Sequence, residues 1–85
     1  MDSRRSDAAA SDLLESVVGE TLASHAEMVN NWLAGRPKSW GYLAGKAVGA
    51  YRRRLGRDLS DAERRTVWAR LWQALTELKV SQERR

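Results

Sequence analysis

Apolar residues recur three and four positions apart along most of the chain, the spacing of one face of an α-helix. The first such stretch runs from about residue 7 or 11 to residue 33. Its apolar face comprises Leu14, Val18, Leu22, Val29, Trp32 and Leu33. Gly35 and Pro37 follow, and they predict the end of this helix because glycine favours a helix C-terminus and proline resists helix continuation. Gly19 lies inside the stretch, where a glycine costs roughly 1 kcal/mol relative to alanine, so a bend or break there is an alternative.

A second helix is predicted from Trp40 to Leu55, with Ser39 as its N-cap and Gly56 at its end. Its apolar face comprises Trp40, Leu43, Ala44, Ala47, Val48, Tyr51 and Leu55. A third helix begins at Ser60, which forms an S-x-x-E capping box with Glu63. Its apolar face comprises Val67, Trp68, Leu71, Trp72, Leu75 and Leu78.

The pattern contains no sustained alternation of apolar and polar residues and no Asn-Gly or Asp-Gly hairpin signal. We therefore expect an all-α fold, a small three-helix bundle, with four helices if the first helix breaks at Gly19 or the second at Gly49. One helical domain is expected over residues 9–80, between flexible tails at residues 1–8 and 81–85. With 85 residues, such a domain buries a modest core.

Few residues in this composition support catalysis or metal binding. The chain has no cysteine, and its one histidine, His25, falls on the apolar side of the first helix without a partner at metal-ligand spacing. It also lacks a phosphate-binding glycine loop and a dinucleotide fingerprint. We expect a non-enzymatic protein with no cofactor and no metal, and we expect His25 at the edge of the core. With no signal peptide and no long apolar run, the expected location is the cytoplasm, away from membranes.

Charge divides the chain into an acidic third and a basic remainder. Residues 1–34 carry two arginines against six carboxylates, whereas residues 35–85 carry thirteen lysines and arginines against five carboxylates. This asymmetry indicates either charge pairing within the molecule or a basic surface for an acidic partner.

Gly41, Gly45 and Gly49 form a stripe beside the apolar face of the second helix. One interpretation is a helix-packing groove, because glycines four apart let another backbone approach closely, either within the chain or from another subunit. The other interpretation breaks the helix at Gly49 and makes residues 50–57 the recognition helix of a helix-turn-helix. The glycine then falls one residue late for that motif.

Seven cations are the candidate phosphate contacts under either interpretation: Lys46, Arg52, Arg53, Arg54, Arg57, Arg64 and Arg65. They predict a small regulatory protein that binds nucleic acid, with DNA as the expected form. The alternative is an adaptor or self-assembling module whose basic face docks an acidic protein surface, with a homo-oligomer left open. The four tryptophans lie at helical spacing on apolar faces, and we expect them in the core.

Overall fold

The computed structural model describes the backbone of residues 2–84 and the side chains of residues 12–84. The part of the chain described is all-α, with four helices and no strand. These are α1 (Asp2–Ser24), α2 (Ala26–Leu33), α3 (Ser39–Leu55) and α4 (Asp61–Glu83). The predicted all-α class is confirmed, but the helices do not separate at Gly19 or at Gly49, the two breaks that the sequence offered.

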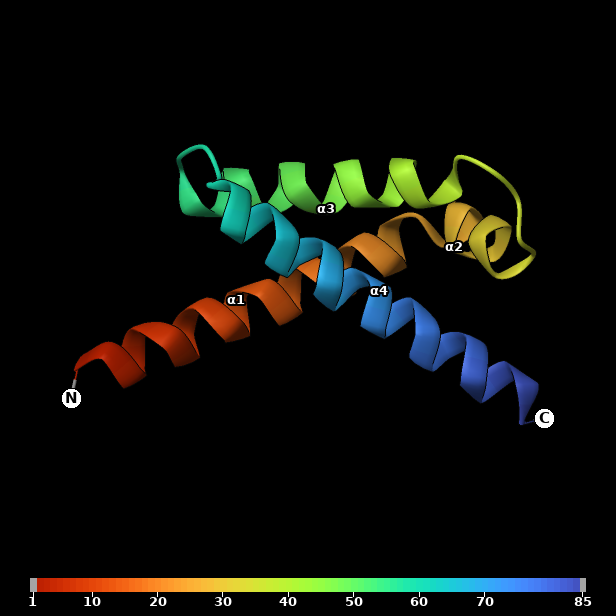
Figure 1. Cartoon of the computed structure of the whole chain (residues 1–85), viewed down its shortest axis with the longest axis horizontal. Coiled ribbons are helices and arrows are strands. Elements are labelled where there is room, and N and C mark those ends of the chain that lie inside the picture. Colours follow the sequence, from red (N-terminus) through yellow and green to blue (C-terminus); the bar gives the residue numbers. More distant parts are fainter. Residues whose placement is uncertain (1, 85) are drawn as a thin grey trace.

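Helix α3 lies along one side of the molecule, and α1 and α4 cross one another on the other side (Figure 1). The short helix α2 lies near the N-terminal end of α3. Because the beginning of α1 and the end of α4 extend in opposite directions, the molecule is elongated, with dimensions of 43 × 25 × 20 Å.

The core lies where α1, α3 and α4 meet. Its fully buried apolar side chains are Val17, Leu43, Ala47, Val67, Leu71 and Leu75. Those from α3 and α4 all belong to the apolar faces that the sequence pattern predicts. Tyr51 is also buried, as its position on the second predicted helix requires.

The first predicted helix is two helices, and they separate at His25. The His25 N–H donates to the Thr21 carbonyl at 3.1 Å and its carbonyl accepts from Val29 at 3.0 Å, so helical hydrogen bonding continues across the kink. The His25 backbone itself is not helical, with φ −124° and ψ 43°. Gly19 lies inside α1, so the prediction of a break there is wrong.

The turn between α2 and α3 follows the predicted glycine signal but shifts the helix start. Gly35 has φ +75°, and its N–H donates to Trp32 at 2.9 Å, which closes α2 in a left-handed turn. The N-cap of α3 is Lys38, also left-handed at φ 70°, so the prediction of Ser39 as N-cap is wrong by one residue. Ser39 is instead buried, and its hydroxyl donates to the Arg36 carbonyl at 2.7 Å.

Helix α3 is continuous from Ser39 to Leu55, so the helix-turn-helix interpretation is wrong. A glycine costs a helix roughly 1 kcal/mol, which is small beside the burial of an apolar face. Leu43, Ala47 and Tyr51 are buried on both sides of Gly49 along the chain, and this packing holds α3 straight through the glycine.

Helix extends into both ranges predicted as tails, since α1 begins at Asp2 and α4 ends at Glu83. The flexibility of residues 1–8 and 81–85 stays a prediction. None of the helices in the described part of the chain combines the length and the apolar character that a bilayer crossing requires.

Candidate functional site

The corner between α3 and α4 is built by local caps. Gly56 ends α3 with φ 73°, and its N–H donates to the Arg52 carbonyl. The Ser60 hydroxyl accepts from the Glu63 N–H at 3.1 Å, while the Glu63 carboxylate accepts from the Ser60 N–H at 2.9 Å. The predicted capping box is therefore confirmed, and it sets the direction in which α4 leaves the corner.

Arg57 reinforces this cap. Its guanidinium donates to both carboxylate oxygens of Glu63 at 2.8 Å, a bidentate pair. The hydrogen bond from Arg57, followed by that from the Ser60 backbone, lowers the pKa of Glu63 from 4.5 to about 2. Arg57 was predicted as a phosphate contact, but here it holds the corner together.

Two more predicted phosphate contacts pair with carboxylates at the same corner. Arg52 Nε lies 3.1 Å from the Asp58 carboxylate, and Arg64 Nη1 lies 3.9 Å from that of Asp61. Arg52 also stands in the last turn of α3, where a cation interacts favourably with the helix dipole. Both arginines thus have an explanation within the chain.

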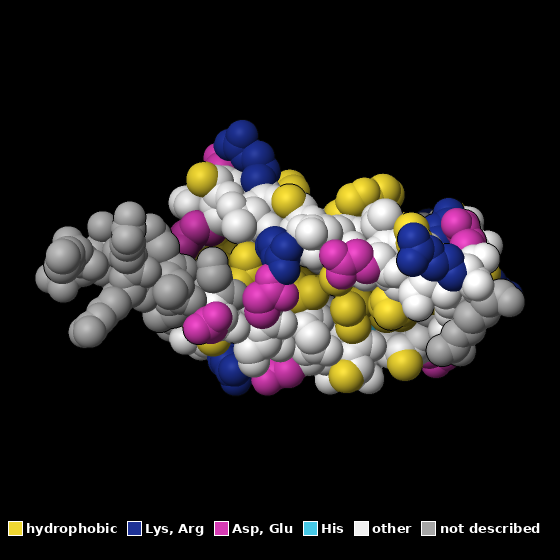
Figure 2. Space-filling view, turned by 90° about the horizontal axis from the view of Figure 1, so that it is seen from below, with side chains coloured by type: hydrophobic (Ala, Val, Ile, Leu, Met, Phe, Trp, Pro, Cys, Tyr) yellow, Lys and Arg dark blue, Asp and Glu magenta, His cyan; other side chains and the backbone are white. Residues whose placement is uncertain are grey.

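The acidic first helix pairs with the basic helices. Arg54 Nη2 of α3 lies 3.6 Å from the Glu20 carboxylate of α1, and Arg70 of α4 pairs with Glu15 of α1. On the face shown in Figure 2, Lys and Arg side chains stand apart from one another, several of them close to Asp or Glu. Part of the charge asymmetry of the sequence is therefore neutralised inside the fold.

Three of the seven predicted phosphate contacts form no ion pair within the side chains described. Lys46 Nζ lies 5.4 Å above the ring of Tyr42. Arg65 donates only to the Asp61 backbone carbonyl, at 3.4 Å. Arg53 approaches the glycine stripe, where its Nη1 would lie 3.7 Å from a Cβ placed on Gly49. Among the described side chains, four of the seven cations therefore pair with a carboxylate and three do not.

The glycine stripe lies uncovered within the described chain. A Cβ built on Gly41 or Gly45 meets no atom within 4 Å. Packing between helices of this molecule therefore does not explain the stripe, and that form of the groove interpretation is wrong. A close contact with another molecule at Gly41, Gly45 and Gly49 stays a prediction.

An apolar groove of about 440 Å³ opens beside this stripe, between α3 and α4. We call it the α3–α4 groove. Its lining residues are Trp40, Gly41, Ala44, Gly45, Val48, Arg64 and Trp68. Two glycines leave the backbone of α3 accessible, two tryptophans supply aromatic surface, and Arg64 supplies the only charge in this lining.

The tryptophans of α4 are not core residues, contrary to the prediction. Trp68 is 42% exposed and Trp72 is 52% exposed, while Trp32 and Trp40 are half-buried. Trp72 packs edge-on against Trp32 and Trp40, with ring centroids 5.4 and 5.3 Å apart. The buried side chains of α4 are Val67, Leu71 and Leu75. Trp68 and Trp72 each follow one of these residues, so they lie about 100° further round the helix, outside the face that packs in the core. The sequence did contain a signal for this. The apolar residues of α4 cover a wider part of the helix surface than one helix–helix contact can bury.

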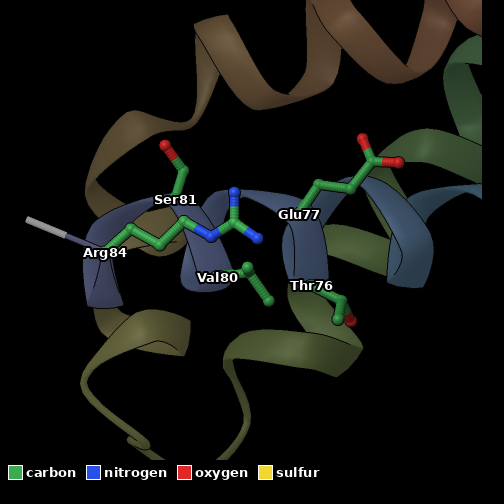
Figure 3. Close-up of a pocket in the computed structure, with 5 residues that line it drawn as sticks. All are labelled: Thr76, Glu77, Val80, Ser81 and Arg84. Carbon is green, nitrogen blue, oxygen red and sulfur yellow. The ribbon is translucent and has the colours of Figure 1, made fainter.

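A further hollow, of about 370 Å³, lies along the end of α4 (Figure 3). Its lining residues all belong to that helix or to its C-cap: Thr76, Glu77, Val80, Ser81 and Arg84. No other helix in the described part of the chain contributes a lining residue, so polar groups from different elements do not meet in this hollow as they do in a binding or catalytic site.

The residues described offer no metal centre, since no three His, Cys, Asp or Glu side chains among them are placed to hold an ion. No protein-family model, curated protein or solved structure matches this chain. Its function must therefore be inferred from the surfaces described above.

Proposed function

We propose that this protein is a non-enzymatic interaction module that binds an acidic, amphipathic helix of a partner protein in the α3–α4 groove. The observation that carries the proposal is an open apolar groove whose floor is a glycine stripe. In a helix interior each glycine costs about 0.8–1.0 kcal/mol relative to alanine, and at Gly41 and Gly45 this chain has room for a methyl group. This loss of helix propensity is explained if the glycines allow the backbone of a bound partner helix to approach α3 closely.

The tryptophans support a protein ligand. Tryptophan is enriched among the hot spots of protein interfaces, and Trp68 lines the groove with 42% of its surface exposed, so a partner can bury it. An amphipathic helix fits such a groove by placing apolar residues three and four positions apart along it. Trp40 and Val48 would contact the apolar side of that helix.

Charge favours an acidic partner over a second copy of this chain. Lys38 and Arg52 stand seven residues on either side of Gly45, and Arg64 lines the groove. Antiparallel pairing of α3 about Gly45 would bring Arg52 of one copy toward Lys38 of the other, and parallel pairing would bring Arg52 toward Arg52. Asp58 offsets part of the charge of Arg52, but both arrangements still juxtapose like charges, whereas a partner helix with a carboxylate beside Arg64 avoids that repulsion.

The test is selection of binders from a displayed library of helical peptides, followed by titration of the selected peptides. We expect apolar residues at helical spacing flanked by Asp or Glu. Trp68→Ala should weaken binding by 2 kcal/mol or more, about 30-fold. Gly45→Leu should abolish binding by filling the groove. Gly19→Leu is the matched control, because Gly19 is also an exposed helical glycine with nothing within 4 Å of its Cβ position.

Peptides without acidic residues, or binding that survives Gly45→Leu, would contradict the proposal. Sedimentation equilibrium addresses the homo-oligomer: a dimer that Gly45→Leu dissociates would assign the groove to a second copy instead.

Nucleic-acid binding is a second candidate, supported by a basic hollow of about 400 Å³ at the end of α3. Its lining residues are Arg52, Arg53, Gly56, Arg57 and Asp58. Titration against a labelled duplex and a single strand tests it. Binding should weaken steeply with salt, and Arg53→Gln should flatten the slope by about one unit, because each phosphate contact releases about one counterion. Flat titrations at moderate salt would remove this candidate and leave the groove unaffected.

A further inference from the structure

A small pocket of about 130 Å³ lies between the end of α1 and the middle of α3, and none of its lining residues belongs to the α3–α4 groove. We call it the α1–α3 pocket. Its lining residues are Glu20, Thr21, Ser24, His25, Lys46, Ala50 and Arg53. It combines the kink at His25 with two of the three predicted phosphate contacts that form no ion pair in the described chain.

The cations of this pocket are available to a ligand. Lys46 and Arg53 stand seven residues apart, which places them on one face of α3 two turns from each other. Neither has a carboxylate within 4 Å among the described side chains. The pocket's one carboxylate, Glu20, pairs with Arg54 at 3.6 Å, and Arg54 does not line the pocket. Lys46 and Arg53 therefore share the pocket with Glu20, whose negative charge is already offset by Arg54, a residue outside the pocket.

Other hydrogen-bonding groups complete the lining. The Ser24 hydroxyl and the His25 ring contribute polar atoms at the α1–α2 kink, while the Thr21 hydroxyl already donates to the Val17 carbonyl at 2.8 Å. Tyr42 orders this side of the pocket. Its ring packs edge-on against His25, with centroids 5.4 Å apart, and Lys46 Nζ lies over the same ring.

Size and charge together define the ligand. At about 130 Å³ the pocket is far smaller than the 300–1,000 Å³ of a pocket for a drug-sized molecule. Lysine and arginine side chains with a hydroxyl beside them suit an anion with several acceptor oxygens. We infer that the α1–α3 pocket binds a phosphate group, either free phosphate or the phosphate of a small phosphomonoester. This inference is independent of the groove function.

The test is titration of inorganic phosphate and methyl phosphate into the ¹⁵N-labelled full chain, at constant ionic strength maintained with sodium chloride. Saturating chemical-shift changes are expected at Ser24, His25, Lys46 and Arg53. The double variant Lys46→Gln/Arg53→Gln should weaken binding at least tenfold with an unchanged helical circular dichroism spectrum. The matched control is Lys79→Gln/Arg36→Gln, which removes one lysine and one arginine that are exposed and line neither the pocket nor the groove.

Saturation that the control variant retains and the pocket variant loses supports the site. Binding of both ligands then indicates a phosphomonoester, and binding of inorganic phosphate alone indicates the free anion. Shifts that do not saturate, or equal losses in the two double variants, would overturn the inference. Gly45→Leu should leave phosphate binding unchanged, so failure at the pocket and failure at the groove are separable.

Discussion

The two sides of α3 that remain accessible differ in chemical character: one is an apolar groove and the other is a polar pocket. On the flank toward α4, glycines and tryptophans form a groove in which Arg64 is the only charged lining residue. On the flank toward the α1–α2 kink, Lys46 and Arg53 line a smaller polar pocket. The buried stripe of Leu43, Ala47 and Tyr51 runs along the same helix and anchors it in the core. The same buried face of α3 thus supports two surfaces, an apolar groove on one side and a basic pocket on the other.

The largest expected loss of stability follows from a change in the buried face of α3, which supports both the groove and the pocket. Leu43 is fully buried, so Leu43→Ala should lower the free energy of unfolding by about 2–5 kcal/mol, through lost burial and the cavity left behind. Both flanks should lose binding together. Urea denaturation measures the change, with Leu78→Ala as control because Leu78 is 39% exposed. A loss no greater than that of the control would mean that Leu43 does not anchor α3.

The capping box should affect the groove flank alone. Ser60→Ala removes the hydroxyl that accepts from Glu63 N–H, so it should cost about 0.5–2 kcal/mol and loosen the start of α4, one wall of the groove. Phosphate binding in the α1–α3 pocket should persist at temperatures where the variant remains folded. Thermal denaturation of Ser60→Ala beside Ser81→Ala, at an exposed position near the end of α4, checks this. Equal melting temperatures would mean that the cap contributes nothing.

Removing a glycine from the groove should separate stability from binding. Gly45→Ala should raise the free energy of unfolding by up to about 1 kcal/mol, because the methyl group meets no atom and restores helix propensity. The same change should weaken peptide binding in the groove. Gly35→Ala should instead destabilise the protein, because Gly35 has φ +75°. Chemical denaturation distinguishes the two, and a destabilised Gly45→Ala would indicate a packed stripe.

Acid should weaken the corner between α3 and α4 through protonation of Glu63. The folded-state pKa of Glu63 is about 2, below its ordinary value of 4.5, mainly because Arg57 donates to the carboxylate. The resulting stabilisation is complete above pH 4.5 and is lost as the pH falls through about 2. Denaturation midpoints between pH 6 and 2 should therefore fall less steeply in Glu63→Gln than in the unmodified chain. Parallel curves would show that the pair does not contribute.

The smallest effect on stability is expected at the Glu20–Arg54 pair. Both side chains are about half exposed, so Glu20→Gln should change the free energy of unfolding by at most about 1 kcal/mol. Because it removes the only carboxylate of the α1–α3 pocket, it should strengthen phosphate binding there. Isothermal titration with inorganic phosphate measures this, and weaker binding would show that Glu20 orients the pocket cations rather than opposing the anion.

The helix limits show where sequence patterns are reliable. The closing glycines at 35 and 56 and the Ser60–Glu63 box lie where the pattern predicts, because each acts through hydrogen bonds between residues at most five apart. The pattern offers a break at Gly19, a residue with low helix propensity, as an alternative to one continuous first helix, but the break occurs at His25. That residue packs against Tyr42 of α3, and such a contact is invisible to the local pattern.

The sequence by itself therefore determined the helical class, most helix ends, the apolar stripes of α3 and α4 and the candidate cations. Only the tertiary structure decided which cations are paired, because Arg54 meets Glu20 and Arg70 meets Glu15 through the packing of α1 on α3 and α4. It also decided that no described residue covers Gly41 and Gly45 and that Trp68 and Trp72 are exposed. Periodicity states which residues share a helix face, but which part of that face is covered depends on where the other helices pack.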